Sequence, residues 1–275
     1  MVGSRCAWFL AGAALLGAVR PAPAQLKAAP GDWPGWRGPD RTGLSAETGL
    51  LEKWPAEGPK QLWKATGLGG GFSTPSVAGG RIYLLGAEGR KERLLALDAR
   101  DGRQLWATPL GALAGNHPGT RSTPTVDGDR VYALSSDGKL VCADTARGAV
   151  RWRKDLEADF GGRPGRYAYA ESPLIDGDVL VCTPGGSTAT LVALDKKTGE
   201  SIWKAALTGL RGRGRLPYTT AAYASAIVAE AAGVRQYIQF LSGGVVGVSA
   251  RDGKLLWHYD RPTSGKPNCS TPLFR

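Results

Sequence analysis

The sequence has few cysteines, and none of them form a pattern that would organise a fold. Four cysteines occur in 275 residues, and no CxxC pair and no cysteine–histidine spacing typical of a zinc site is present. The first 24 residues have the pattern of a cleaved leader and contain Cys6, which leaves an odd number, Cys142, Cys182 and Cys269. These absences exclude a disulfide framework and a zinc-organised domain.

The cysteines that remain are better explained by packing than by chemistry. Cys142 and Cys182 lie in the apolar, strand-like runs KLVCAD and VLVCTP. We therefore expect both thiols to be buried, as small hydrophobic side chains are. One disulfide pair remains an alternative in an oxidising compartment.

Long apolar runs are also scarce. Residues 6–19 (CAWFLAGAALLGAV) form one such run, too short to span a bilayer comfortably, and Ala-Pro-Ala at 22–24 supplies a small-x-small cleavage site. This pattern predicts a secretory signal peptide over residues 1–24, cleaved near Ala24, with a short membrane anchor as the alternative. No second membrane-spanning candidate follows. We expect an exported protein of the periplasm or cell envelope that is not transmembrane.

The net charge is strongly positive, at +11 for the whole sequence, and falls to +9 without Arg5 and Arg20 of the leader. A basic balance can indicate nucleic-acid binding. Here the arginines are scattered among turns beside glycine or aspartate, and an exported protein seldom meets nucleic acid. The sequence therefore predicts a solvated basic surface and no nucleic-acid partner.

No long helical period stands out, and what the sequence offers in its place is a repeat. The segment ALDKKTGESIW has three relatives, each with a glycine four residues before a closing tryptophan, and the tryptophans are 46, 51 and 54 residues apart. The four copies cover residues 96–106, 142–152, 193–203 and 247–257. A period of about 40–50 residues with a recurring aromatic indicates a repeat architecture.

Each copy closes a longer unit that reads as four short strands. In the second unit, Asp127-Gly128 and Asp137-Gly138 are strong hairpin signals between alternating or apolar runs. The units cover residues 73–106, 122–152, 172–203 and 222–257, and another begins at 270–275. Four antiparallel strands per unit predict an all-β protein, a β-propeller with one blade per unit. At the start of the fourth unit a helix remains an alternative, although VRQYIQF and VVGVSA favour strands.

The recurring positions of the unit have structural explanations. We expect Trp106, Trp152, Trp203 and Trp257 to dock against the neighbouring blade. Asp98, Asp144 and Asp195 are turn formers whose carboxylates can accept backbone N–H groups. Before the blades, residues 25–56 carry Trp33 and Trp36 and predict an extended arm packed on the main domain over residues 57–275.

These motifs resemble a known family. Ala193, Asp195, Thr198, Gly199 and Trp203 match the tryptophan-docking pattern AxDxxTGxxxW of quinoprotein-like propellers. STPTVDGDRVY at 122–132 and WPGWRGP at 33–39 fit the same group. The chain is similar to exported PQQ-like β-propeller repeat proteins of bacteria, over nearly all of its length after the leader.

The resemblance implies a ring of seven or eight blades, of which about four blades and fragments are present. It implies that residues 57–63 are an outer strand donated to the last blade, and that the sequence is a truncated piece whose open arc exposes unpaired strand edges. The family includes PQQ-dependent alcohol dehydrogenases, which hold the quinone and a calcium ion on the propeller axis. It also includes the outer-membrane assembly lipoprotein, which has no cofactor.

Candidate ligand-binding residues lie in the loops between blades, at 107–121, 153–171, 204–221 and 258–269. A quinone with three carboxylates would need arginines and an aromatic platform, and calcium would need oxygen ligands. The speculative cofactor-binding set is Arg121, Tyr169, Glu171, Asn116 and His117, with His117 as a candidate base. Polar loops of this kind occur on any propeller, so we assign no catalytic residue and no metal site.

The sequence therefore leaves two main functions open. The first is an exported, non-catalytic binding or scaffold module, with a protein or small-molecule ligand at the propeller mouth. The alternative is a PQQ-dependent dehydrogenase of an alcohol or sugar, with PQQ and calcium as its cofactors. The adjacent cysteine pair of many such dehydrogenases is absent, which counts against the enzyme. A polysaccharide-binding propeller using Trp33 and Trp36 is a third, weaker idea.

Overall fold

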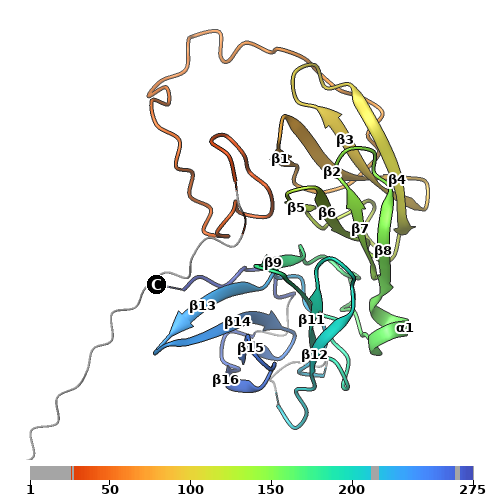
Figure 1. The fold of residues 1–275 in the computed structure, drawn as a ribbon, viewed down its shortest axis with the longest axis vertical. Helices are drawn as coiled ribbons and strands as arrows, with labels where there is room; N and C mark the ends of the chain where they lie inside the picture. The colour runs from red at the N-terminus through yellow and green to blue at the C-terminus, as the bar shows by residue number, and fades with distance from the viewer. Residues whose placement is uncertain (1–25, 27, 212–216, 264–266, 275) are drawn as a thin grey trace, which may run out of the picture.

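The computed structural model describes Leu26 and residues 28–211, 217–263 and 267–274. The predicted signal peptide at residues 1–24 lies outside these ranges. The described chain is almost entirely β and forms four sheets of four antiparallel strands, arranged one after another around a common centre (Figure 1). The all-β prediction of four-stranded blades is confirmed.

Each sheet is a simple meander in which consecutive strands pair. The first blade contains β1 (Ser76–Ala78), β2 (Arg81–Glu88), β3 (Lys91–Asp98) and β4 (Gln104–Ala112). The second contains β5 (Thr125–Asp127), β6 (Arg130–Leu134), β7 (Lys139–Asp144) and β8 (Val150–Asp155). The third contains β9 (Leu174–Asp176), β10 (Val179–Cys182), β11 (Leu191–Asp195) and β12 (Ser201–Ala205). The fourth contains β13 (Ile227–Ala231), β14 (Val234–Leu241), β15 (Gly244–Ser249) and β16 (Leu255–Tyr259).

In the first three blades, the turn before the outer strand is organised by the aspartate that the sequence singled out. Asp195 Oδ1 accepts hydrogen bonds from the backbone N–H groups of Lys197 and Thr198, both at 2.8 Å. These bonds lower the pKa of the Asp195 carboxyl. The turn ends at Gly199, which holds φ 75°. The carboxylate thus has a structural role in closing the turn.

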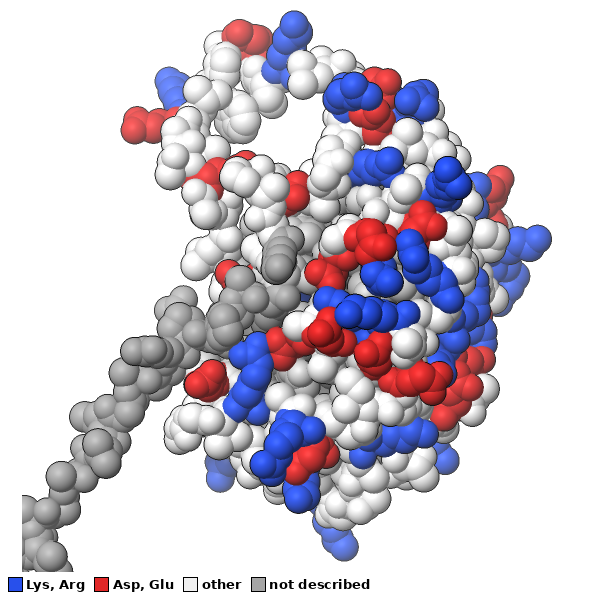
Figure 2. Space-filling view, viewed as in Figure 1, with Lys and Arg blue, Asp and Glu red and all other residues white. Residues whose placement is uncertain are grey.

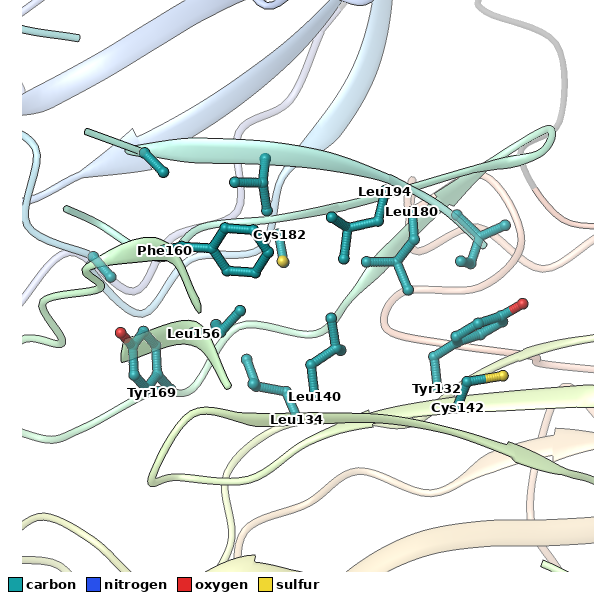
Figure 3. Close-up of a cluster of buried hydrophobic side chains, with 14 of the residues drawn as sticks. Tyr132, Leu134, Leu140, Cys142, Leu156, Phe160, Tyr169, Leu180, Cys182 and Leu194 are labelled. Atoms are coloured by element: carbon teal, nitrogen blue, oxygen red, sulfur yellow. The ribbon is translucent and has the colours of Figure 1, made fainter. Parts of the chain in front are cut away.

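Apolar side chains fill the space between successive blades. Three clusters lie at the interfaces of blades one and two, two and three, and three and four. The second of these is drawn in Figure 3, where Tyr132, Leu134 and Leu140 of blade two face Leu180 and Leu194 of blade three. Cys142 and Cys182 both lie in this cluster as free, buried thiols, and this confirms their packing role.

A tryptophan closes each of these interfaces from the outer strand. The indole N–H donates to a backbone carbonyl in the aspartate turn of the next blade: Trp106 to Thr145 at 3.2 Å, Trp152 to Lys196 at 3.1 Å and Trp203 to Ala250 at 3.1 Å. The ring also covers the glycine of that turn. A Cβ built on Gly148 would lie 2.5 Å from Trp106 Cε3, so only glycine lets the indole lie flat there.

The fourth blade ends the arc without such a partner in the described structure. Trp257 donates instead to Gln236 Oε1 of its own blade at 2.6 Å, and its side chain is 36% exposed. All five residues of β16 are exposed. The four sheets do not close into a ring (Figure 1).

Two details settle or go beyond the sequence-based expectations. The start of the fourth unit forms β13 and β14, so the helical alternative is wrong. A short helix, α1 (Leu156–Phe160), follows β8; the side chain of Asp155 caps it by accepting from Glu157 and Ala158, and Gly161 ends it at φ 62°. None of the helices in the described ranges is long and apolar enough to cross a bilayer.

The segment before the first blade divides into a packed part and an exposed part. Residues 33–41 lie against the inner strands, whereas Leu44, Leu51, Trp54 and Leu62 are all more than half exposed. Residues 57–63, which are described, form no strand. Trp63 nevertheless docks on the first blade as the other tryptophans do, with its indole N–H 3.2 Å from the carbonyl of Ala99.

Candidate functional site

The loops that join one blade to the next gather at one end of the arc, which we call the mouth. Each outer strand ends there and each inner strand begins there, because four antiparallel strands return the chain to its starting end. The described parts of the predicted loops 107–121, 153–171, 204–221 and 258–269 all lead into this end. All five speculative cofactor-binding residues belong to these loops, and their side chains are placed one by one below.

Three aromatic rings from three successive loops form a row at the mouth. His117 lies 4.9 Å from Tyr167, and Tyr167 lies 5.6 Å from Tyr223, measured between ring centroids. The Tyr223 hydroxyl also accepts the backbone N–H of Tyr167 at 3.1 Å. The Arg166 guanidinium lies 5.9 Å from the centre of the Tyr167 ring, within the range of a cation–π contact. We call His117, Tyr167 and Tyr223 the aromatic row.

Arg121 holds the first of these loops in place. Its guanidinium donates to the carbonyls of Ala114 at 3.2 Å and His117 at 2.7 Å. Partial burial lowers its pKa, which the negative charge of Glu92 partly offsets. Asn116 and His117 are exposed at the tip of the same loop. The structure thus brings Arg121, Asn116 and His117 together on one loop beside the aromatic row.

Tyr169 lies inside the protein and not at the mouth surface. Its ring is 1% exposed within the cluster between blades two and three (Figure 3). Its hydroxyl donates to the carbonyl of Pro184 at 3.0 Å, and its backbone N–H donates to Ser136. Burial raises the pKa of the phenol. The side chain that presents a ring at the surface is Tyr167, two residues earlier.

Glu171 is also buried, at the start of the third blade. Its carboxylate accepts from the backbone N–H of Thr183, from the Thr183 hydroxyl at 2.8 Å and from Gln239 Nε2 at 3.1 Å. Burial raises the pKa of Glu171 to about 7, although these three donors and Arg41 favour the charged form. Thr183 and Gln239 come from neighbouring blades, so the carboxylate links blades three and four.

The positive charge of Arg41 stabilises the charged form of Glu171. Arg41 was not identified as a site residue from the sequence. It is 4% exposed, and its guanidinium donates to the carbonyls of Ala226 at 2.9 Å, Ser172 at 3.0 Å and Pro173. Burial lowers its pKa to about 10, while the charge of Glu171 acts in the opposite direction. The only signal in the sequence was its position just after WPGWRGP.

The Ser-Thr-Pro motif of the second unit and the equivalent positions of the third and fourth units, Ser172 and Ser225, tie the inner strands together. The Thr123 backbone N–H donates to Ser172 Oγ at 3.0 Å, and the Ser172 N–H donates to Ser225 Oγ at 2.9 Å. Thr125 Oγ1 donates to the carbonyl of Pro173 at 2.6 Å. Equivalent positions of successive blades therefore bond to one another, which explains why the motif recurs.

Metal-binding chemistry finds little support around these residues. Within the described ranges, three or more histidine, cysteine or acidic side chains nowhere come together as a metal site would require. A separate hollow of about 670 Å³ lies at the opposite end of blades three and four. Its main polar groups bind each other, since Asp176 accepts from Arg235 and from the Tyr237 hydroxyl. The mouth remains the stronger candidate surface.

The family of the chain follows from its match to a protein-family model. The model described as outer membrane protein assembly factor BamB matches residues 38–140 and again residues 90–270. The chain belongs to this family. The resemblance of the repeats to PQQ-like propellers is thereby confirmed, because the overlapping matches cover the four blades.

Solved structures with the same fold include both enzymes and BamB. The quinohemoprotein alcohol dehydrogenase from Comamonas testosteroni aligns with a TM-score of 0.57 at 17% identity, over 89% of this chain and 43% of that one. BamB from Moraxella catarrhalis aligns with a TM-score of 0.50 at 16% identity, over 75% of this chain and 56% of that one. At such identities the likeness shows the fold alone.

A relative with a higher sequence identity is named as a protein kinase. The serine/threonine-protein kinase AfsK of Streptomyces griseus is 33% identical over 162 residues, which is 58% of this chain and 19% of that protein. The chain thus spans about a fifth of this relative and less than two thirds of each solved structure above. The activities in the names of these matches differ from one another.

Proposed function

We propose that this BamB-family chain is an exported, non-catalytic binding module that holds a protein partner at its mouth. The observation that carries the proposal is that the Glu171 carboxylate is already fully hydrogen-bonded within the protein. Both oxygens of this buried carboxylate already accept hydrogen bonds from Thr183 and Gln239, so they serve the interface of blades three and four. The name of the family, an assembly factor, agrees with a role in binding proteins.

The accessible groups at the mouth suit a protein partner. His117, Arg163 and Arg166 are exposed, and Tyr167 and Tyr223 are half-buried beside them. Aromatic rings and arginines are the side chains most enriched at the energetic centres of protein interfaces. The basic excess of the chain favours an acidic segment on the partner. Elsewhere on the surface, positive and negative side chains alternate, as Figure 2 shows for one face.

A PQQ-dependent dehydrogenase is the second candidate, favoured by the fold it shares with the Comamonas testosteroni enzyme. The described residues do not fit the quinone and calcium well. Glu171 is enclosed by hydrogen-bond donors, Tyr169 is in the core, and Arg121 is committed to two loop carbonyls. A calcium ion would need several oxygen ligands around one point, which this set does not bring together. We derive no reaction step from it.

One experiment separates the two candidates. The purified chain is incubated with PQQ and calcium, freed of unbound quinone by gel filtration, and assayed for dye reduction with ethanol and with glucose. We expect no quinone absorbance on the protein and no dye reduction. Quinone retained in a one-to-one ratio, together with substrate-dependent dye reduction, would favour the enzyme and contradict the proposal.

The binding role needs its own test. A photo-crosslinking amino acid is placed at Tyr167 in the mouth and, as a matched control, at Asp129 in the hairpin at the opposite end of blade two. We expect a discrete crosslinked partner in the cell envelope from position 167 and none from position 129. Equal crosslinking from both positions, or none from either, would count against a mouth-directed partner.

A further inference from the structure

The packed part of the arm, residues 32–41, pairs with the inner strands of blades one and two and reaches the residues just before those of blades three and four. Trp33 exchanges two backbone hydrogen bonds with Val77 of β1, at 2.7 and 2.9 Å. The carbonyl of Pro34 accepts the Val126 N–H of β5 at 2.7 Å. Figure 1 shows this segment at the centre of the arc, on the side of β1, β5, β9 and β13. A segment so placed lies where the axis of a propeller runs.

The far end of the segment is anchored by side chains. Arg41 reaches the carbonyls of Ser172 and Pro173, next to β9, and of Ala226, next to β13. Trp36 Nε1 donates to Thr271 Oγ1 at 2.8 Å, in the motif that begins the next unit. The arm therefore contacts the start or the body of every inner strand. These contacts are made to backbone atoms and a hydroxyl that a bound peptide could equally use.

The backbone of Arg41 is in a conformation that needs support from its surroundings, as is that of Arg37 at φ 63°. Arg41 has φ 55°, in the left-handed region that costs a non-glycine residue about 1 kcal/mol or more. Such a conformation persists when the surroundings fix it. The buried guanidinium, held by three carbonyls and facing the charge of Glu171, is the part that can fix it.

The connection from this segment to the first blade is loose by contrast. Leu44, Leu50 and Leu51 are 76%, 68% and 70% exposed, and Trp54 is 62% exposed. Residues 42–62 arch away from the blades in both views (Figures 1 and 2). Residues 32–41 are thus held on the blades by their own contacts, because the connecting residues 42–62 add few contacts.

From these observations we infer that the axial face of the arc is a peptide-binding surface, and that residues 32–41 are its tethered ligand, anchored by Arg41. The segment occupies the axial face of the arc, so the loops at the mouth are the binding surface that stays open. A peptide from another protein would have to displace this segment to reach the inner strands. The inference does not depend on the function proposed for the mouth.

The test uses the full chain with a specific protease site in place of exposed residues 48–53. After cleavage, gel filtration and mass spectrometry measure how much of the released segment stays with the blades. We expect it to remain bound, and Arg41→Ala to speed its dissociation at least about tenfold, in line with the loss of several charge-assisted hydrogen bonds. Arg37→Ala is the matched control, since the Arg37 guanidinium bonds to the carbonyl of nearby Thr42 within the same segment, so its loss should leave dissociation unchanged.

A second measurement avoids any effect of Arg41→Ala on folding. Synthetic peptides of residues 28–45 are added to the cleaved chain that carries the normal arm, and exchange is followed by mass. We expect the native and Arg37→Ala peptides to exchange in and the Arg41→Ala peptide to fail. The inference would be overturned if the native segment were lost at once on cleavage, or if the Arg41→Ala segment were retained equally well. It would also be overturned if the Arg41→Ala peptide exchanged in as readily as the native peptide.

Discussion

The three closed interfaces between blades differ sharply from the open face of the fourth blade, although one sequence motif produces both. At the closed interfaces, Trp106, Trp152 and Trp203 reach a carbonyl and cover a glycine of the next blade. On the open face, Trp257 lies back over Gly247 and bonds to Gln236 of its own blade. The motif therefore supplies the indole N–H donor, and the presence of a neighbouring blade determines which acceptor it bonds to.

The same contrast appears in the cores. Each closed interface contains a cluster of ten or more buried apolar residues, whereas the cluster on the open face, among the residues that the structure describes, consists of Ile227, Ala229 and Ile238 with Val245 and Phe274 beside them. Burial of apolar surface is the main source of stability in such a fold. Changes at closed interfaces should accordingly cost more than matched changes outside them.

The largest effect is expected where a docking glycine is replaced. Gly148→Val places a branched side chain at φ 72° and against Trp106, whose Cε3 would be 2.5 Å from the new Cβ. We expect a loss of about 4 kcal/mol in the free energy of unfolding, from backbone strain and displaced packing together. Urea denaturation followed by circular dichroism measures it.

Gly128→Val is the matched control for this substitution. Gly128 has φ 58°, also positive, but a Cβ added there would have no atom within 4 Å beyond its own chain neighbours. It should cost about 2 kcal/mol, the strain alone. Equal losses for the two valines would show that the contact with Trp106 contributes nothing.

The next effect concerns the buried charge between blades three and four. The pKa of Glu171 is raised by burial from 4.5 to about 7, so the folded state holds a proton that the unfolded state loses between these values. The free energy of unfolding should therefore fall by about 3 kcal/mol as the pH rises from 4.5 to 7, and level off above. Glu171→Gln should remove this slope.

The measurement is a series of urea denaturations between pH 4.5 and 8. Glu200→Gln is the control, because Glu200 is largely exposed in its ion pair with Lys154 and should leave the slope unchanged. An identical slope in the Glu171→Gln variant and the native chain would rule out Glu171 as the titrating group.

A smaller difference is expected between two cysteines. Cys182 lies in the closed interface of blades two and three, whereas Cys269 is exposed in the segment that follows the fourth blade. Cys182→Ser buries a hydroxyl among apolar groups and should cost about 2 kcal/mol. Cys269→Ser should change stability by less than about 0.5 kcal/mol. Thermal or urea unfolding compares them, and a costly Cys269→Ser would break the contrast.

The mildest test leaves the sequence unchanged. The native chain is treated with an alkylating reagent, and the modified cysteines are mapped by mass spectrometry. Cys269 should be labelled at once, and Cys142 and Cys182 only after unfolding, because burial removes access and raises their pKa values. Rapid labelling of Cys182 in the folded chain would mean that the closed interface opens readily.

Much of the fold was predictable because it repeats. The glycine and aspartate turns and the spaced tryptophans are local signals, and each recurs often enough to be recognised. The docking role of Trp106, Trp152 and Trp203 followed from the same spacing. The helix α1 could not be predicted in this way, since five residues are too few to show a helical period.

The candidate site was predictable only in outline. Asn116, His117 and Arg121 lie together on one loop between blades, and their role in binding stays a prediction. Sequence could not tell that Tyr169 points into the core while Tyr167 stays at the surface. Arg41 had no recognisable pattern, because its partner Ala226 lies 185 residues further along the chain. Contacts of that range depend on how the blades assemble, which no local signal encodes.

The central claim is that a docked indole joins its blade to the next one. Its most direct test compares the free energies of unfolding of Trp203→Ala and Trp257→Ala under the same conditions. We predict a loss of about 3 kcal/mol for Trp203→Ala, which empties a closed interface, and less than about 1 kcal/mol for Trp257→Ala, which leaves Gln236 open to water. Equal losses for the two variants would contradict the account.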